Sequence, residues 1–233
     1  MTAAQDVYAF LSRYRMNPAE IDFVALYEDI IAEMERGLAG KQSSLEMIPT
    51  YIEPGRAMRS QGPVIVIDAG GTNFRSALLS LDPEKGLVIE KFEKKPMPGI
   101  GKEIGRDEFF ATIASYLDRI ADESDSIGFC FSYPMEILPS LDGRLIRFCK
   151  EIRAPEVEGE LIGEGLRRAL QDRGHKKIRK IVLLNDTTAT LLAGRSMAAG
   201  SCRYDSYLGF ILGTGMNCCY TESEIPKLGT SSG

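Results

Sequence analysis

The segment from Val64 to Arg75, VIVIDAGGTNFR, combines residue types that bind phosphate groups and metal ions. It begins with a run of β-branched residues, which favours a buried strand, and this strand ends at Asp68. A carboxylate at a strand end can hold Mg²⁺, usually through water. Two adjacent glycines let backbone N–H groups approach a phosphate, and the next polar residues add donors and a fixed cation. The candidate phosphate-binding residues are Gly70, Gly71, Thr72, Asn73 and Arg75, with Asp68 as the metal-binding acid.

A simpler interpretation of this segment stays open, in which the glycines only form a tight hairpin at positive φ. The chain does turn here from one apolar run into a second, from Phe74 to Leu79. Two other glycine-rich phosphate motifs are absent from the sequence: no G-x-G-x-x-G opens a helix, and no G-x-x-x-x-G-K-[ST] occurs. A helix N-terminus is therefore not expected to be the first contact for a phosphate.

A second candidate segment is Leu184 to Thr188, LNDTT, where an apolar strand delivers Asn185 and Asp186 to the start of a helix. Ligands favour the carboxyl ends of strands in α/β sheets. An aspartate held beside a substrate hydroxyl can take its proton during phosphoryl transfer. A helix-capping role for Asp186 explains the same residues equally well.

A third candidate is the turn Gly213, Thr214 and Gly215, which is followed by Asn217. It again joins two apolar runs through glycines, and it repeats the first turn without the leading acid. Two such hairpins suggest two halves of a protein that face one nucleotide, although a plain hairpin turn is the alternative. Weaker candidates lie between these segments: Ser132, Tyr133 and Pro134, which follow an apolar run, and Lys150, which follows Phe148 and Cys149.

Composition narrows the class of protein. The chain has 233 residues, a net charge of −5 and a pI near 5.2, which argues against general nucleic-acid binding. No run of 18 apolar residues predicts a membrane span, and the first residues do not resemble a signal peptide. Five cysteines without a C-x-x-C pair, and one histidine, argue against a structural zinc site. We expect reduced thiols and a cytoplasmic protein.

Periodicity predicts a mixed α/β protein with helices covering a sheet. Residues 4–40 have a helical pattern with Asn17 as a cap before Pro18, and residues 41–62 form a connector. Expected strands cover residues 63–68, 73–81, 87–94, 127–131, 181–184, 207–212 and 216–220. Expected helices cover residues 106–123, 157–173 and 187–199, and a hairpin is expected at residues 141–144.

Taken in order, these segments resemble the eukaryotic-type hexokinase family, which includes the animal glucokinases. IDAGGTNFR resembles the family's phosphate-1 segment, GFCFSYP its sugar loop, VLLNDTTAT its catalytic-aspartate segment and ILGTGMNCCYTE its phosphate-2 segment. The order and spacing agree over residues 47–222. The family usually has Ser-Phe-Pro where this chain has Ser132, Tyr133 and Pro134, and Trp-Thr-Lys where it has Phe148, Cys149 and Lys150.

The resemblance implies an actin-like, ribonuclease-H-like ATPase fold and ATP-dependent transfer of a phosphoryl group to the 6-hydroxyl of a hexose, the first step of glycolysis. It implies glucose, mannose or fructose as substrate, with ATP and Mg²⁺ in a cleft. Asp186 is then the general base, and Asp68 organises Mg²⁺. By position, the hexose contacts are Ser132, Tyr133, Pro134, Cys149, Lys150, Asn185, Asp186 and Asn217, and the phosphate contacts are Gly70, Gly71, Thr72, Asn73, Arg75, Gly213, Thr214 and Gly215.

The resemblance also implies a division into lobes. Residues 1–61 are expected to belong to the large lobe, residues 62–184 to form the small lobe, and residues 185–233 to begin the large lobe. The family's chains continue past the phosphate-2 turn and supply further sugar and adenosine contacts there. We therefore expect an incomplete second lobe and no activity from residues 1–233 alone.

Two other functions stay open at this stage. The first is a non-catalytic sugar-binding or regulatory module of the same fold. The second is a bacterial sugar kinase of the repressor/glucokinase type, although that group carries an E-x-G-H motif and a cysteine-rich zinc loop. The histidine of this chain, His175, lies in the sequence Asp172-Arg173-Gly174-His175. The sequence does not set the oligomeric state.

Overall fold

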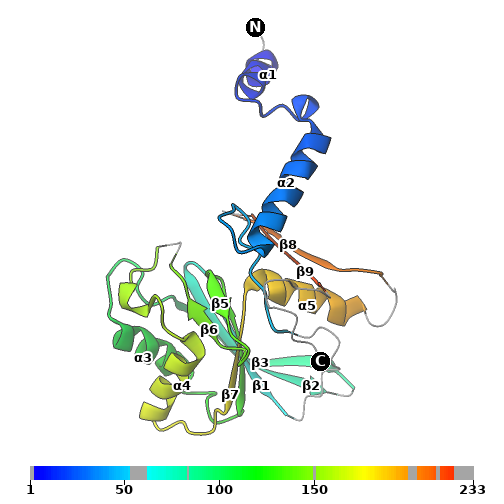
Figure 1. Cartoon of the computed structure of the whole chain (residues 1–233). Helices are drawn as coiled ribbons and strands as arrows, with labels where there is room; N and C mark the ends of the chain where they lie inside the picture. The colour runs from blue at the N-terminus through cyan, green and yellow to red at the C-terminus, as the bar shows by residue number, and fades with distance from the viewer. Residues whose placement is uncertain are drawn as a thin grey trace. The chain divides into compact units, whose positions relative to one another are not determined.

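The computed structural model describes residues 3–52, 62–82, 84–148, 151–198, 204–213 and 216–222. The chain forms two compact units, one up to Pro49 and one from Thr50 to Glu222. Figure 1 shows that the described strands all belong to the second unit. The candidate residues Cys149, Lys150, Thr214 and Gly215 lie outside the described residues. The lobe boundaries near residues 62 and 185 remain predictions.

The first unit is helical, as the sequence predicts, but its helices are interrupted. It contains α1 (Ala3–Arg13), the short 3₁₀ helix η1 (Pro18–Glu20) and α2 (Phe23–Leu38). Asn17 caps η1 through the backbone N–H of Ala19, at 3.1 Å. The long helix α2 is capped by Asp22 and not by Asn17. Ile21, which precedes Asp22, has an extended backbone and ends η1, so α2 starts as a separate helix.

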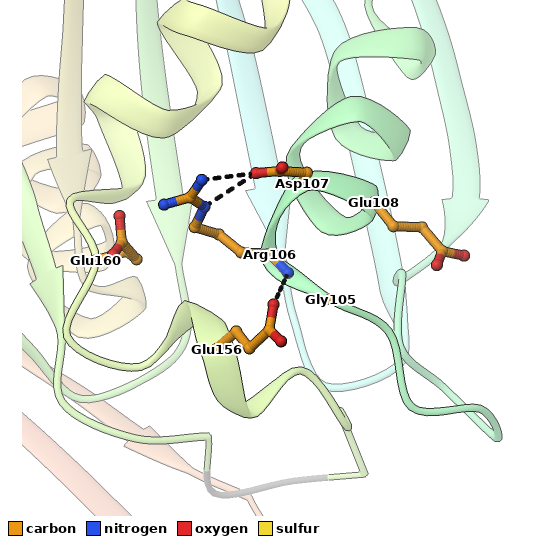
Figure 2. A pocket seen from close by; sticks show the side chains of 6 residues that line it. All are labelled: Gly105, Arg106, Asp107, Glu108, Glu156 and Glu160. Atoms are coloured by element: carbon orange, nitrogen blue, oxygen red, sulfur yellow. Dashed lines mark hydrogen bonds and ion pairs between the residues drawn. The ribbon is translucent and has the colours of Figure 1, made fainter.

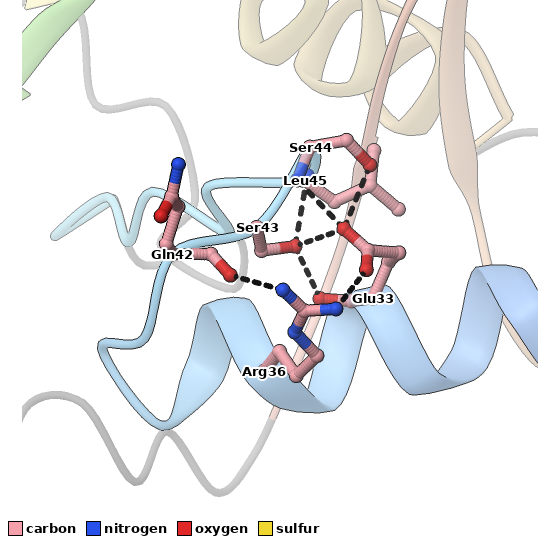
Figure 3. A network of polar contacts seen from close by, with 6 residues as sticks. All are labelled: Glu33, Arg36, Gln42, Ser43, Ser44 and Leu45. Carbon is pink, nitrogen blue, oxygen red and sulfur yellow. Dashed lines mark hydrogen bonds and ion pairs between the residues drawn. The ribbon is translucent and has the colours of Figure 1, made fainter.

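The C-terminal half of α2 is joined to the loop after it by hydrogen bonds centred on the Glu33 carboxylate, shown in Figure 3. Glu33 Oε2 accepts hydrogen bonds from the Ser43 hydroxyl at 2.8 Å and from the Ser44 backbone N–H at 2.7 Å. Arg36 donates to Glu33 Oε1 at 2.7 Å and to the Gln42 carbonyl at 2.7 Å. These donors favour the ionised carboxylate, with the Ser44 N–H contributing most, and they lower the pKa of Glu33 to about 2.

This shift predicts a pH-dependent loop. The folded pKa of Glu33, about 2, lies below its ordinary value of 4.5, so the stabilisation is complete above pH 4.5 and is lost as the pH falls toward 2. We expect the exchange of the Ser44 amide to accelerate over this range. Amide exchange measured by NMR tests this, with Glu33→Gln expected to weaken the Ser44 protection at pH 6. Glu35→Gln, on the same helix, is the control. Unchanged Ser44 exchange in Glu33→Gln would contradict the assignment.

The second unit is built on a five-stranded mixed sheet. Its strands are β1 (Val64–Ala69), β2 (Asn73–Asp82), β3 (Gly86–Pro96), β4 (Ser126–Phe131) and β7 (Lys180–Leu184), and their order is β3-β2-β1-β4-β7. The pairs β1–β2 and β2–β3 are antiparallel, whereas β1–β4 and β4–β7 are parallel. The strands expected in these five places are confirmed to within two residues.

The other elements connect or extend this sheet. α3 (Arg106–Tyr116) lies between β3 and β4, and β5 (Met135–Ile137), β6 (Gly143–Leu145), η2 (Pro155–Val157) and α4 (Ile162–Asp172) lie between β4 and β7. After β7 come α5 (Asp186–Ala198) and the hairpin of β8 (Leu208–Leu212) and β9 (Met216–Tyr220). The hairpin expected near residue 142 is confirmed as β5 and β6.

One face of the sheet forms the core, because alternate residues of β1 and β4 are buried. In Figure 1, α3 and α4 lie together beside the sheet, and their side chains complete the core. The main contributors are Ile65, Ile67, Ala69, Ile127, Phe129 and Phe131 from the strands, and Phe109, Ile113, Ile162 and Leu166 from the helices. Asp68 falls between buried positions and therefore lies on the opposite face, where it is partly exposed.

Two predicted helices have different ends in the structure. The helix expected at residues 106–123 ends at Tyr116, and the chain continues as a series of turns. The helix expected at residues 157–173 begins only at Ile162, because Gly159 has a φ of +86° and breaks the regular backbone. Asp142, from the β5–β6 hairpin, caps α4 by accepting hydrogen bonds from the Gly163 and Glu164 N–H groups at 2.7 and 2.9 Å. A cap more than twenty residues away cannot be recognised from local sequence.

Candidate active site

Three of the candidate segments leave the sheet side by side, because β1, β4 and β7 are adjacent and parallel. Ala69 of β1 is paired with Phe131 of β4, and the neighbouring Cys130 is paired with Leu184 of β7. Neighbouring strands are roughly 4.8 Å apart, so the turn after β1 and the start of α5 are separated by roughly 10 Å. The sheet thus places the glycine turn after β1, the Ser132 loop and the Asn185–Asp186 pair at one edge.

Three backbone hydrogen bonds hold the turn after β1, residues 70–73: one within the turn, one from the loop after β4 and one from the residue after β3. The Gly70 N–H donates to the Asn73 carbonyl at 3.0 Å, closing the turn. The Ser132 N–H donates to the Ala69 carbonyl at 3.1 Å, and the Met97 N–H donates to the Thr72 carbonyl at 3.0 Å. The Asn73 side chain donates to the Thr72 hydroxyl at 3.1 Å, so these two predicted phosphate contacts lie together.

The simple hairpin explanation for the glycines does not account for Gly70. Its φ is not positive, and among the described residues a Cβ added there would approach only the Asn73 carbonyl, at 3.8 Å. The fold therefore does not require glycine at this position, either for its backbone angles or for space inside the protein. What glycine does provide at this partly exposed turn is room for another group to approach the backbone.

Asp68 and Arg75 face each other across β1 and β2 on the side of the sheet away from the core. Arg75 Nη1 lies 2.6 Å from Asp68 Oδ2, and the two side chains are 41% and 47% exposed. A half-exposed carboxylate suits Mg²⁺, which keeps several waters and takes one or two protein carboxylates together with substrate phosphates. Within the described ranges, no three His, Cys, Asp or Glu side chains form a metal-binding group.

Asn185 and Asp186 share the N-terminus of α5. Asn185 Oδ1 accepts from the Thr187 N–H at 3.0 Å, and Asp186 Oδ1 accepts from the same N–H at 2.8 Å and from the Thr187 hydroxyl at 3.3 Å. The capping role considered for Asp186 is thus shared with Asn185. Asp186 Oδ2 makes no hydrogen bond to a residue that the structure describes, so one oxygen of this carboxylate is left for another partner.

The segment that contains Asn217 contacts the segment that contains Asn185 and Asp186. Asn217, on β9, donates from Nδ2 to Asn185 Oδ1 at 3.0 Å, and its own Oδ1 accepts from the Cys218 N–H at 2.9 Å. On β8, Gly209 passes so close to α5 that an added Cβ would lie 2.7 Å from the Thr187 carbonyl oxygen. The hairpin of β8 and β9 therefore packs against the first turns of α5, and it brings Asn217 beside Asn185 and Asp186.

Tyr133 differs from the other predicted hexose contacts that the structure describes, because its side chain is buried. Its side chain is 1% exposed, and its hydroxyl donates to the Gly70 carbonyl at 2.9 Å. Its ring packs against Phe131 and Phe148, with centroid distances of 4.7 and 5.1 Å. The side chain of Tyr133 is therefore enclosed by the core, whereas its neighbours Ser132 and Pro134 are partly exposed. Nothing in the local sequence distinguishes this buried tyrosine from an exposed loop residue.

A shallow cavity of about 490 Å³ lies at the N-terminus of α3 (Figure 2), and none of the candidate residues is among those that line it. Glu156 Oε2 accepts from the Arg106 backbone N–H at 2.9 Å, and the Arg106 guanidinium donates twice to Asp107 Oδ1. The hydrogen bonds and charge of Asp107 raise the pKa of Arg106 above its ordinary value. Because these groups satisfy one another and cap the helix, this cavity is explained by local structure.

Comparison with known proteins decides which family the chain represents. The family model described as "Hexokinase" matches residues 7–196. The chain belongs to the hexokinase family. It is 30% identical over 197 residues to the "Hexokinase" of Brugia malayi, and 32% identical over 207 residues to "Hexokinase-1" of Schizosaccharomyces pombe. These alignments cover 81% and 85% of this chain, but 34% and 42% of the two hexokinases.

Solved hexokinase structures have the same fold. The hexokinase from Schistosoma mansoni complexed with glucose aligns with a TM-score of 0.66 and 24% identity, covering 94% of this chain and 50% of that one. A second structure, described as a crystal structure of hexokinase, aligns with a TM-score of 0.67 and 22% identity, covering 88% of this chain and 50% of that one. The actin-like, mixed α/β fold is thereby confirmed. The chain spans about half the length of these hexokinase structures.

No helix in the described part of the chain is both long enough and apolar enough to cross a bilayer.

The site predicts a contrast between two substitutions. We expect Arg75→Met to change the free energy of unfolding by less than about 1 kcal/mol, because exposed ion pairs contribute roughly 0–1 kcal/mol. Tyr133→Ala removes a buried ring and is expected to lower that free energy by about 3–5 kcal/mol. Urea unfolding followed by circular dichroism measures both. A loss of several kcal/mol in Arg75→Met would show instead that the ion pair holds β1 and β2 together.

Proposed function

We propose that this chain forms the hexose- and phosphate-binding part of an ATP-dependent hexokinase. The reaction transfers the γ-phosphoryl group of MgATP to the 6-hydroxyl of glucose or a related hexose. The observation that supports this most strongly is the meeting of Asp68, Ser132 and Asp186 at the carboxyl ends of adjacent parallel strands. Phosphoryl transfer depends mainly on positioning and charge neutralisation, and these residues offer both.

In this proposal Asp186 is the general base. Its Oδ1 is held by Thr187, while Oδ2 has no hydrogen-bond partner among the described residues and is left for the 6-hydroxyl of the hexose. A carboxylate fixed in this way can accept the hydroxyl proton as the oxygen attacks phosphorus. Because both Thr187 donors bind one oxygen, the carboxylate cannot rotate away without losing them.

The hexose contacts follow from the polar side chains around Asp186. Asn185 and Asn217 each carry amide donors and an acceptor, and their mutual hydrogen bond at 3.0 Å fixes which atoms remain for a ligand. Ser132 adds a hydroxyl from the neighbouring strand end. Cys149 and Lys150 are proposed hexose contacts that lie outside the described residues. The hexokinase of Schistosoma mansoni with the same fold was solved with glucose, which supports a hexose as the substrate class.

The phosphate contacts are proposed at the two glycine turns. At the first turn, Gly70 has space that the fold does not use, and Thr72, Asn73 and Arg75 place donors beside it. Asp68 is the residue that would hold Mg²⁺, which neutralises phosphate charge when bound. At the second turn Gly213 is described, whereas Thr214 and Gly215 are not.

Replacing Asp186 with Asn tests the proposal. Asp186→Asn keeps an oxygen that can accept from Thr187, so the helix cap survives, but it removes the base. In a hexokinase-length protein that contains this segment, we expect kcat to fall roughly 10²–10⁴-fold with little change in the Kd for glucose.

The matched control is Asp172→Asn, at the end of α4, which should leave kcat unchanged. Near-normal turnover of Asp186→Asn would refute the catalytic assignment and leave the sugar-binding or regulatory module as the better description.

Cys149 gives a second test that does not depend on catalysis. A thiol is a weaker hydrogen-bond donor and acceptor than a hydroxyl. If Cys149 faces the hexose, Cys149→Thr should tighten glucose binding by about 0.5–1.5 kcal/mol, the net value of one hydrogen bond. Calorimetric titration of both proteins with glucose measures this difference. Equal or weaker binding by the threonine protein would show that this side chain does not touch the sugar.

A further inference from the structure

The buried hydroxyl of Tyr133 connects the Ser132 loop to the glycine turn after β1, residues 70–73. Tyr133 and its partner Gly70 lie 63 positions apart in the chain. We propose that Tyr133 is a positioning residue that fixes the Gly70–Gly71 peptide, so that the Gly71 N–H is presented to a phosphate. This inference rests on the proposed function, because it assigns a phosphate to this turn. It concerns the Tyr133 hydroxyl specifically, rather than the space that the ring fills.

The hydrogen bond from the Tyr133 hydroxyl to the Gly70 carbonyl is one that the buried hydroxyl needs. Tyr133 is 1% exposed, and its Oη lies 2.9 Å from the Gly70 carbonyl oxygen. A hydroxyl shielded from water to this degree is destabilising unless it is hydrogen-bonded. The ring cannot shift easily, because it packs at an interplanar angle of 82° against Phe148 and at 50° against Phe131. The oxygen is therefore a fixed point at the base of the turn.

Because the peptide is planar, the hydrogen bond from Tyr133 to the Gly70 carbonyl also sets the direction of the Gly71 N–H. The Gly70 carbonyl and the Gly71 N–H belong to one planar trans peptide, in which the two groups point in opposite directions. Holding the carbonyl toward the core therefore aims the N–H away from it. Both flanking residues are glycines, which lack the Cβ that restricts rotation elsewhere in the chain. Without an anchor this peptide is the freest unit of the turn, and Tyr133 supplies the anchor.

The same ring also contacts the segments that carry the proposed hexose residues. Tyr133 directly follows Ser132 in the chain, and its ring packs on Phe148, which directly precedes Cys149 and Lys150. The Tyr133 side chain thus contacts both proposed hexose segments and the Gly70 carbonyl. Phenylalanine would fill the same space and keep the ring contacts, but it would leave the Gly70 carbonyl without this donor.

The test compares Tyr133→Phe with Tyr116→Phe in a hexokinase-length protein that contains this segment, so that the adenosine contacts expected beyond the second glycine turn are present. Tyr116 is a matched control, because it also packs against an aromatic ring, that of Phe74, and its hydroxyl has no hydrogen bond to a described residue. Two quantities are measured by NMR: the exchange rate of the Gly70 amide without ligand, and the Kd for Mg²⁺–ATP from the shift of the Gly71 amide. Loss of one net hydrogen bond corresponds to a change of roughly 2- to 12-fold.

We expect Tyr133→Phe to accelerate Gly70 exchange and to raise the Kd by roughly this factor, while amides in α4 and both quantities in Tyr116→Phe stay unchanged. No change at Gly70 in Tyr133→Phe would overturn the proposal. Faster exchange throughout β1, β4 and α4 would also overturn it, because it would mean a general loss of core packing. If the unmodified chain shows no shift with Mg²⁺–ATP, the proposed phosphate role of the turn fails. In that case a change confined to Gly70 would still establish the anchor.

Discussion

The parallel pairing of β1, β4 and β7 is the constraint on which the rest of the site depends. It makes three separate stretches of chain end at one edge of the sheet, with Ala69 beside Phe131 and Cys130 beside Leu184. Each strand carries buried apolar residues that fix its register, because a slip by one residue would turn them out of the core. The same hydrophobic burial that stabilises the sheet therefore also sets the spacing between the glycine turn after β1 and Asp186.

Side-chain alternation gives this edge of the sheet two different faces: one packs into the core, and the other carries the charged side chains. Ile67 and Ala69 point into the core with α3 and α4, whereas Asp68 between them points to the opposite face and meets Arg75. The Tyr133 side chain packs in the core, although Tyr133 lies in the loop that carries Ser132. The charged residues are thus left exposed on rigid strands, and buried neighbours hold their backbone in place.

The hairpin of β8 and β9 has a different basis from the main sheet. It is held to α5 by the close approach of Gly209 and by the Asn217–Asn185 hydrogen bond, while Leu208, Phe210 and Leu212 remain exposed. A two-stranded hairpin is marginal by itself in water, so its contacts with α5 matter for its order. Asn217 therefore has a structural contact as well as a proposed ligand contact, and substitutions there are expected to affect both.

Local sequence determined the strands, the first glycine turn and the pair Asn185–Asp186, because β-branched runs, glycines and strand-end acids have short-range signals. The ordered series of segments also indicated the hexokinase family, which the match over residues 7–196 shows. Only the tertiary structure decided that Asp142 caps α4, that Asn217 reaches Asn185 and that Tyr133 holds Gly70. These three contacts join residues 21, 32 and 63 positions apart. Their partners are selected by sheet order and core packing, which no local pattern of residues contains.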